Sequence, residues 1–213
     1  KNLIGTFKQP NPVFIDLSFL NTLTKEQVID GFSEIIKYGL ICDFDLYNKI
    51  KNNFTNLVNF KNKNLIYDII LKSIKHKINI VTKDELDYNQ RMILNFGHTI
   101  GHGLENYYNY QNITHGDAVY YGMISASFIS FKLKYLTNND FEDITDFIYK
   151  IPKFKIHNVD IDKLYNCLTY DKKNINNINH FIILNKIGHA IIKNNIPKDI
   201  IFESMNFIIN RKK

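Results

Sequence analysis

The stretch from Arg91 to Glu105, which reads RMILNFGHTIGHGLE, constrains this chain more than any other. Residues three and four positions apart are neighbours on the surface of a helix. Read as one helix, the stretch therefore carries a cation, an amide, two imidazoles and a carboxylate on a single stripe, at Arg91, Asn95, His98, His102 and Glu105. Such a face is costly to bury unless something binds it. It is either a binding site or a solvated polar face.

Two glycines, Gly97 and Gly101, interrupt this predicted helix. Each glycine costs a helix about 1 kcal/mol relative to alanine. We therefore expect a close neighbour or a ligand at this point, because either one would account for two glycines at four-residue spacing.

Composition excludes several classes of protein. The chain has 213 residues, enough for one large domain, and a formal net charge of +6, but its lysines are scattered. A nucleic-acid-binding surface needs basic residues gathered on one face, whereas a mildly basic protein is suited to anionic small molecules. The two cysteines lack metal or redox spacing, which indicates a reducing compartment. With no signal peptide and no apolar run of about 18 residues, we expect a cytoplasmic protein and no membrane partner.

The chain is predicted to be mainly α-helical. Val13–Leu17 is a short run of β-formers between Pro12 and Ser18 and is predicted to form a strand. Thr24 followed by Gln27 is typical of a capping box that starts a helix. A β-hairpin is expected around Ile187 and Gly188. Further helices are predicted over residues 44–54, 65–81, 118–134, 139–149, 160–168 and 197–210.

Glu34 and Lys37 lie one helical turn apart. Pairs of this kind are most often exposed and of little energetic value. Here the surrounding residues are apolar, so a buried functional pair and an exposed ion pair are about equally expected.

Four residues are candidate metal ligands: Glu34, His98, His102 and His115. Catalytic zinc takes three nitrogen or oxygen ligands and keeps one position open, and histidines four residues apart on a helix can supply two of them. Spacing alone favours His98 and His102, although a buried structural histidine is a serious alternative. The cationic and amide side chains of Lys37, Lys77, Arg91, Asn95 and Lys172 suggest an anionic, oxygen-rich substrate beside the metal.

These segments together resemble 3-dehydroquinate synthase. The matching stretches are KNLIGTFKQPNPVFIDLSFLNTL, GFSEIIKYGLI, KINIVTKDELDYNQR, LNFGHTIGHGLE, HGDAVYYGM and DKK before an apolar strand. They follow the order of the family across nearly the whole chain, and NFGHTxGHxxE followed by HG[DE]AV is a highly specific combination.

The resemblance implies the helical C-terminal domain of an α/β fold, with a short N-terminal strand and a small β-hairpin. Residues 1–20 would be the tail of an N-terminal NAD-binding domain, and residues 21–213 the metal- and substrate-binding domain. The chain opens at Lys1 without methionine and without a Gly-rich dinucleotide fingerprint, so we expect a fragment, a processed chain or one piece of a split protein. It should be inactive without the NAD-binding segment, and a homodimer is usual in the family.

The family's reaction converts 3-deoxy-D-arabino-heptulosonate 7-phosphate into 3-dehydroquinate and phosphate, in the shikimate pathway of aromatic amino acid biosynthesis. It uses NAD and Zn²⁺ or Co²⁺. A ring hydroxyl is transiently oxidised, phosphate is eliminated, the ketone is reduced again, and ring opening with an aldol closure completes the carbocycle.

The resemblance also assigns residues, and it corrects the spacing-based choice of His102 as a ligand. The metal ligands would be Glu34, His98 and His115, while His102 matches a proton acceptor. Other catalytic positions would be Lys37, Lys77 and Asp87, the last being Glu in most of the family. Substrate contacts would be Asn2, Arg91, Asn95 and Lys172, with Lys173 as an alternative. Positions near NAD would be Lys1, Phe19, Leu20, Asn21 and Thr22.

Alternatives remain open at this point. Another sugar-phosphate cyclase of the same fold would share the three ligands, and a polyol dehydrogenase of the superfamily would show net reduction of the nicotinamide. An inactive structural fragment is the alternative from a different class. A helical metal-dependent phosphohydrolase needs an adjacent His-Asp pair, which the sequence lacks.

Overall fold

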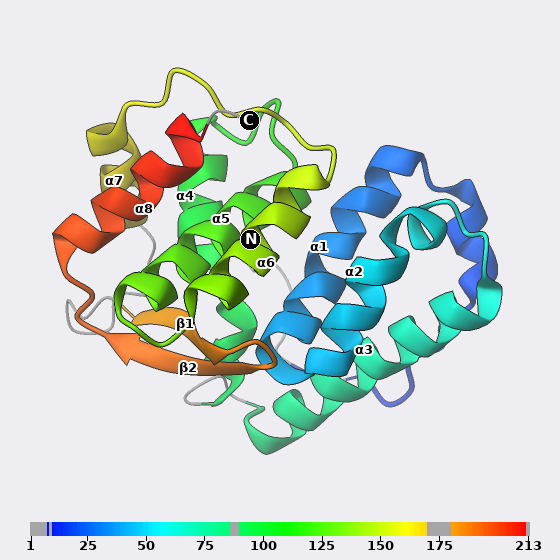
Figure 1. The fold of residues 1–213 in the computed structure, drawn as a ribbon. Coiled ribbons are helices and arrows are strands. Elements are labelled where there is room, and N and C mark those ends of the chain that lie inside the picture. The colour runs from blue at the N-terminus through cyan, green and yellow to red at the C-terminus, as the bar shows by residue number, and fades with distance from the viewer. Residues whose placement is uncertain (1–7, 9, 86–89, 170–179, 212–213) are drawn as a thin grey trace.

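The computed structural model describes residues 8, 10–85, 90–169 and 180–211, and these form a helical bundle with one β-hairpin (Figure 1). The prediction of a mainly α-helical fold is therefore confirmed. The helices are η1 (Leu17–Thr22), α1 (Lys25–Cys42), α2 (Phe44–Val58), α3 (Lys63–Lys83), η2 (Gln90–Asn95), α4 (His98–Tyr107), α5 (His115–Lys132), α6 (Asn138–Lys150), α7 (Ile161–Thr169) and α8 (Lys198–Asn210), where η marks a 3₁₀-helix. The strands are β1 (His180–Lys186) and β2 (His189–Asn194).

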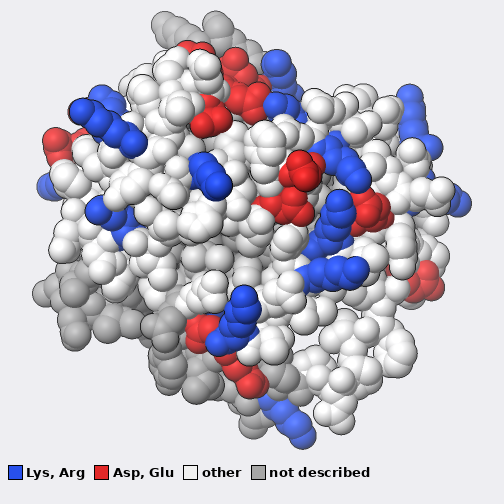
Figure 2. Space-filling view, turned by 60° about the horizontal axis from the view of Figure 1, so that its bottom comes forward, with Lys and Arg blue, Asp and Glu red and all other residues white. Residues whose placement is uncertain are grey.

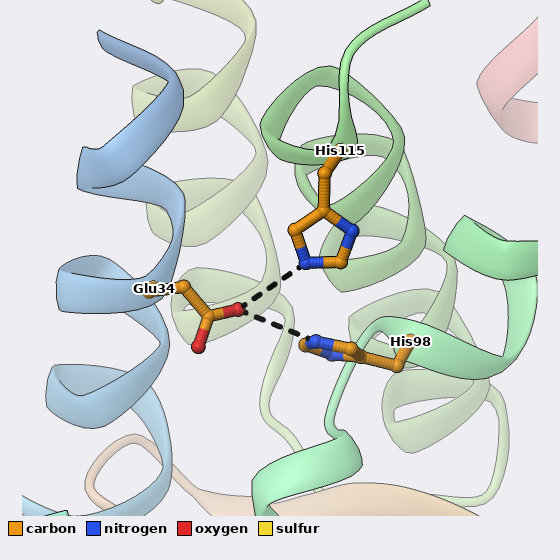
Figure 3. A group of neighbouring side chains, drawn as sticks. All are labelled: Glu34, His98 and His115. Atoms are coloured by element: carbon orange, nitrogen blue, oxygen red, sulfur yellow. Dashed lines mark ion pairs between the residues drawn. The ribbon is translucent and has the colours of Figure 1, made fainter. Parts of the chain in front are cut away.

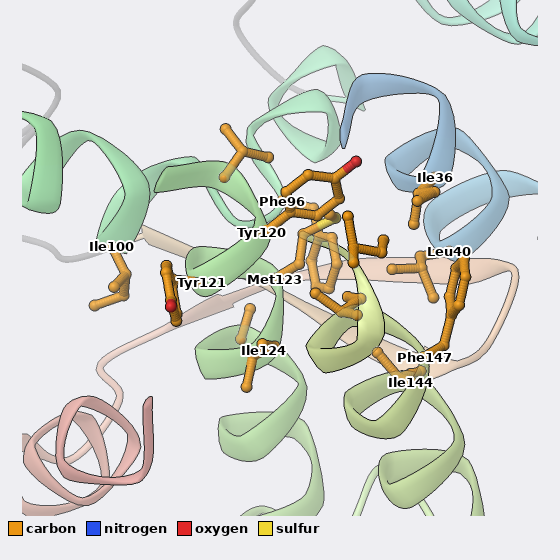
Figure 4. Close-up of a cluster of buried hydrophobic side chains, with 14 of the residues drawn as sticks. Ile36, Leu40, Phe96, Ile100, Tyr120, Tyr121, Met123, Ile124, Ile144 and Phe147 are labelled. Carbon is orange, nitrogen blue, oxygen red and sulfur yellow. The ribbon is translucent and has the colours of Figure 1, made fainter. Parts of the chain in front are cut away.

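Helix α5 forms the centre of the core because it is apolar on nearly all sides, and a helix of that kind must be covered by neighbours. It packs against α1, α4, α6, α8 and β1. Tyr120, Met123 and Ile124 are completely buried in the cluster shown in Figure 4. The hydroxyl of Tyr120 donates a hydrogen bond of 2.8 Å to the carbonyl of Ile29, which ties α5 to α1.

The close packing of α4 on α5 depends on glycine. Gly97 directly precedes α4 and has a φ of +78°, a left-handed conformation that favours glycine. A side chain at Gly122 of α5 would overlap the carbonyl oxygen of Gly97. Gly101 faces the Ala118 carbonyl, which a Cβ would meet at 3.2 Å. The sequence led us to expect a close neighbour at Gly97 and Gly101. That neighbour is the backbone of α5.

Side chains cap two of the three helices that carry the site, α1 and α5. Thr24 and Gln27 form the predicted capping box of α1, with backbone-to-side-chain hydrogen bonds of 3.3 and 2.9 Å. Helix α1 then runs on through Gly31 to Cys42. Thr114 caps α5 by accepting a hydrogen bond of 3.1 Å from the backbone N–H of Asp117. His115 is thereby fixed as the first residue of α5.

The predicted hairpin is confirmed. Strands β1 and β2 are antiparallel, with His180 opposite Asn194 and Ile183 opposite Ile191. Gly188 in the turn has a φ of +84°, and its N–H donates a 2.8 Å hydrogen bond to the carbonyl of Leu40. The hairpin therefore closes one end of the bundle, at the bottom of Figure 1.

Two sequence predictions are wrong. Residues 13–17 do not form a strand: within the described residues the only strand pairing is that of β1 with β2, and Val13, Phe14 and Ile15 are exposed. A strand requires a neighbour to accept its ladder of hydrogen bonds. Arg91–Glu105 is also not one helix, because the left-handed Gly97 separates η2 from α4. The five polar residues consequently do not share a helical stripe.

On the face shown in Figure 2, Lys and Arg side chains are interspersed with Asp and Glu and separated by neutral surface. Among the described residues, no helix has the length and apolar character needed to cross a membrane.

Candidate metal centre

Glu34 enters the site from the middle of α1. Its Oε2 atom accepts a hydrogen bond of 2.6 Å from Nζ of Lys37, one turn later on the same helix. The Lys37 side chain is only 3% exposed, and an ammonium group is rarely buried without such a partner. The lysine of the pair is therefore buried, whereas the Glu34 side chain is 38% exposed.

Two imidazoles reach the other oxygen of Glu34, as Figure 3 shows. His98, the first residue of α4, places Nε2 at 3.3 Å from Glu34 Oε1, and His115, the first residue of α5, places Nε2 at 3.8 Å. One ligand atom from each of these residues lies within 4.8 Å of the other two. Three separate helices thus bring one carboxylate and two imidazoles to a single point.

The electrostatics of the cluster are those of a site that attracts positive charge. Burial alone would raise the pKa of Glu34, but His115, His98 and Lys37 hold it well below its usual range. The pKa of His115 is raised to about 9, first by its hydrogen bond with Glu105 and then by Glu34. In the metal-free chain a proton is therefore held where a cation would bind, and metal binding displaces such protons.

A divalent metal fits the residues that are present. Glu34 Oε1 is buried, and its contacts with the two Nε2 atoms, at 3.3 and 3.8 Å, are ion pairs without hydrogen-bond geometry. A buried carboxylate oxygen without a donor is costly, and a cation between it and the two Nε2 atoms removes that cost. Two imidazole nitrogens and one carboxylate oxygen form a ligand set that suits Zn²⁺ or Co²⁺ and leaves room for a further ligand.

His102 and Glu105 lie beside this cluster on α4. The rings of His98 and His102 have centroids 5.4 Å apart in an edge-to-face arrangement. His102, Glu105 and His115 form a second group whose ligand atoms lie within 4.8 Å of one another. His115 is common to both groups, whereas Glu34 and His98 belong only to the first.

The described residues of the predicted substrate contacts come from two elements, α3 and η2. Lys77 lies on α3 and is near enough to Lys37 for its positive charge to add to the lowering of the Lys37 pKa that burial causes. Arg91 lies on η2, which packs against both α1 and α3, and its guanidinium donates a 2.6 Å hydrogen bond to the carbonyl of Glu85. Asn95 is the last residue of η2.

The predicted cofactor residues lie in a different part of the fold. Phe19, Leu20, Asn21 and Thr22 belong to η1, where Leu20 and Asn21 line a cavity of about 250 Å³ with Phe60 of the α2–α3 turn and Ile66 of α3. Phe19 is 72% exposed. The remaining predicted positions, Lys1, Asn2, Asp87, Lys172 and Lys173, lie outside the described residues.

One contact that positions the site was not predicted. Asp30 of α1 accepts a 2.7 Å hydrogen bond from the backbone N–H of Gly116, the residue after His115. The contact fixes the start of α5 against α1, one turn before Glu34. A carboxylate is favoured at a helix N-terminus, but this one comes from another helix, so the sequence around His115 does not reveal it.

Comparison with known proteins agrees with this architecture. A profile of the family described as 3-dehydroquinate synthase C-terminal matches residues 31–174. Proteins named 3-dehydroquinate synthase from Alkaliphilus oremlandii and Ruthia magnifica are 41% and 36% identical over 209 and 208 residues. These alignments cover 98% and 97% of this chain and 57% and 58% of the relatives, so the chain spans little more than half their length.

Solved structures share the fold. A 2-epi-5-epi-valiolone synthase from Streptomyces hygroscopicus, with NAD⁺ and Zn²⁺ bound, superposes with a TM-score of 0.85 at 21% identity and covers 98% of this chain and 58% of its own. A 2-deoxy-scyllo-inosose synthase complexed with carbaglucose-6-phosphate, NAD⁺ and Co²⁺ superposes with a TM-score of 0.79 at 26% identity, covering 98% and 59%. Since the family profile spans most of the sequence and agrees with the fold, this chain belongs to the 3-dehydroquinate synthase C-terminal family.

Proposed function

We propose that this chain is the metal- and substrate-binding part of a 3-dehydroquinate synthase, acting together with an NAD-binding segment. The substrate would be 3-deoxy-D-arabino-heptulosonate 7-phosphate and the products 3-dehydroquinate and phosphate. One observation carries the proposal: Glu34, His98 and His115 converge within 4.8 Å beside the buried ammonium of Lys37. The similarity to relatives of that name favours this substrate, and a cytoplasmic location and a homodimer remain predictions.

Glu34, His98 and His115 would hold Zn²⁺ or Co²⁺, the metals present in the two related structures. When bound, the metal polarises a substrate oxygen and NAD accepts and returns a hydride. The protein's part is to hold one substrate in a single orientation through several steps, which replaces repeated encounters by an intramolecular reaction.

The cations next to the cluster suit a substrate that carries a phosphate and a carboxylate. Lys37 is held by Glu34 and would direct its ammonium toward a substrate oxygen. Lys77, on α3, and Arg91, on η2, would bind the anionic groups, with Asn95 as a hydrogen-bonding partner.

His102 is our candidate for the proton acceptor. It lies one turn after the ligand His98 on α4, and its side chain is 28% exposed. A histidine beside the metal, partly open to solvent, can accept a proton from the substrate and return it. Asn2, Asp87 and Lys172 for the substrate, and Lys1 with residues 19–22 for NAD, also remain predictions.

A chimera tests the proposal. The part of the Alkaliphilus oremlandii relative that aligns with this chain is replaced by it, and phosphate release is measured with NAD and zinc. We expect release from 3-deoxy-D-arabino-heptulosonate 7-phosphate, no net NADH, and loss of most activity in His102→Asn. The chain alone should bind zinc without turnover.

The alternatives give different results in the same assay. A folded, zinc-binding chimera that releases phosphate only from sedoheptulose 7-phosphate or glucose 6-phosphate would identify another cyclase. Net NADH formation would identify a polyol dehydrogenase. A chain that binds no metal would be an inactive structural fragment, and the proposal would be wrong.

A further inference from the structure

Glu105 uses its two carboxylate oxygens on two different histidines. Oε1 lies 3.2 Å from Nδ1 of His115, and Oε2 lies 4.0 Å from Nε2 of His102. The Glu105 side chain is only 13% exposed. Glu105 therefore contacts one of the proposed metal ligands and the proposed proton acceptor, although it lies outside the proposed ligand set.

The two histidine ligands are held in the same way but by different acceptors. In each, Nε2 points toward Glu34, while Nδ1 faces an oxygen of the protein: the carbonyl of Phe96 at 3.1 Å for His98 and the Glu105 carboxylate for His115. An acceptor at Nδ1 keeps the hydrogen there, so the lone pair of the neutral ring lies on Nε2. Both rings are thus presented with the nitrogen that a metal requires.

His115 depends on this contact more than His98 does. Its side chain is 44% exposed, against 12% for His98, so packing restricts its ring less. It also follows a loop that contains positive-φ residues at Asn109, Tyr110 and Asn112. The hydrogen bond that His115 Nδ1 donates to Glu105, on the neighbouring helix α4, is consequently the contact that fixes the direction of the ring.

We propose that Glu105 is a positioning residue, which holds His115 as the Nδ1–H tautomer with Nε2 directed at the metal. The inference rests on the proposed metal site and deepens it. A carboxylate behind a ligating imidazole fixes its orientation and strengthens its bond to the metal, and loss of such a partner lowers metal affinity by about 10–100-fold.

The test compares two variants of similar volume. Glu105→Gln keeps an oxygen that can accept from Nδ1, whereas Glu105→Met removes the acceptor. Zinc affinity is measured by competition with a chromophoric chelator, and urea unfolding verifies that each variant folds. Asp117→Asn is the matched control, because it removes a carboxylate from the first turn of α5, two residues from His115.

We expect Glu105→Met to lose about 10–100-fold in zinc affinity, Glu105→Gln to lose clearly less, and Asp117→Asn to stay within about twofold of the wild type. Histidine ¹⁵N spectra of the zinc-loaded wild type should show His115 bound through Nε2 with a protonated Nδ1, a pattern that Glu105→Gln keeps. A purely structural role for Glu105 would not produce this difference between Gln and Met.

Two results would overturn the inference while the metal site stands: unchanged zinc affinity in Glu105→Met, or binding of wild-type His115 through Nδ1. The spectrum of the wild type decides the question even if Glu105→Met does not fold. Failure of the wild-type chain to bind zinc would overturn the metal site and this inference together.

Discussion

Replacing Gly122 by alanine tests whether the α4–α5 contact determines the geometry of the site. In a helix interior, glycine to alanine normally stabilises by about 0.5–1 kcal/mol. At Gly122, however, the added Cβ would overlap the carbonyl oxygen of Gly97 and stand 2.7 Å from its carbonyl carbon and 3.0 Å from the nitrogen of Gly101. Carbon contacts need about 3.5–4.0 Å, so α4 must move by roughly 1 Å.

The cost of such overpacking is about 1–3 kcal/mol, which outweighs the gain in helix propensity. We therefore expect Gly122→Ala to lower the free energy of unfolding by about 1–2 kcal/mol. Because His98 directly follows Gly97, zinc affinity should fall as well. Urea unfolding measures the loss of stability, provided that the m-value is unchanged. Zinc titration measures the loss of affinity.

Gly31→Ala is the matched control. Gly31 also lies within a helix, but a Cβ there would meet nothing within 4 Å. We expect this variant to be more stable by about 0.5–1 kcal/mol and to bind zinc normally. If both variants are stabilised and both bind zinc normally, the inferred contact between α4 and α5 does not determine the site.

Three further predictions concern pH, the α1–α5 contact and metal removal. Burial raises the pKa of Asp43, but the N–H of Leu46 and the His76 ring outweigh it, so the folded value lies below the usual one. A lowered folded pKa gives a stability that is present above the unfolded pKa and is lost as pH falls through the folded pKa. The advantage of wild type over Asp43→Asn, about 0.5–1 kcal/mol near neutral pH, should therefore shrink as pH falls below the usual carboxyl range. An advantage that grows in acid would contradict the sign. Asp30→Ala should weaken zinc binding in titration, because Gly116 loses its acceptor on α1, and unchanged affinity would rule out that role. Zinc at about 100 times its Kd should raise the free energy of unfolding by about 2.7 kcal/mol, and EDTA should reverse the gain in a thermal melt; a melting temperature indifferent to EDTA would argue against the site.

Local signals in the sequence predicted the helices well. The capping box of Thr24 and Gln27 marked the start of α1, and Gly188 marked the hairpin turn. These features depend on residues only a few positions apart. The local sequence therefore contains the residues whose interactions form them.

The break in the Arg91–Glu105 segment could not be seen locally. Gly97 is left-handed and lies against Met123 of α5, which a Cβ would meet at 2.8 Å, and that neighbour is distant in sequence. Helical spacing consequently suggested a stripe that does not exist. The strand predicted over residues 13–17 failed for a related reason, because a β-forming sequence does not supply a pairing partner.

Helical spacing also could not assemble the candidate centre. His115 lies on a different helix from His98, and both approach Glu34 from a third. The resemblance to a family brought the three together as an expectation. The contacts of Asp30 with Gly116 and of Glu105 with His115 join separate helices, and neither follows a periodic pattern.

Metal binding by the purified chain tests the account most directly. X-ray absorption and calorimetry of the Co²⁺- or Zn²⁺-loaded chain should show one metal per chain, with two imidazoles and oxygen ligands at about 2.0–2.2 Å. Glu34→Gln and His98→Ala should each weaken binding strongly. A chain that binds no metal, or that binds it equally well after Glu34, His98 and His115 are all replaced, would contradict the account.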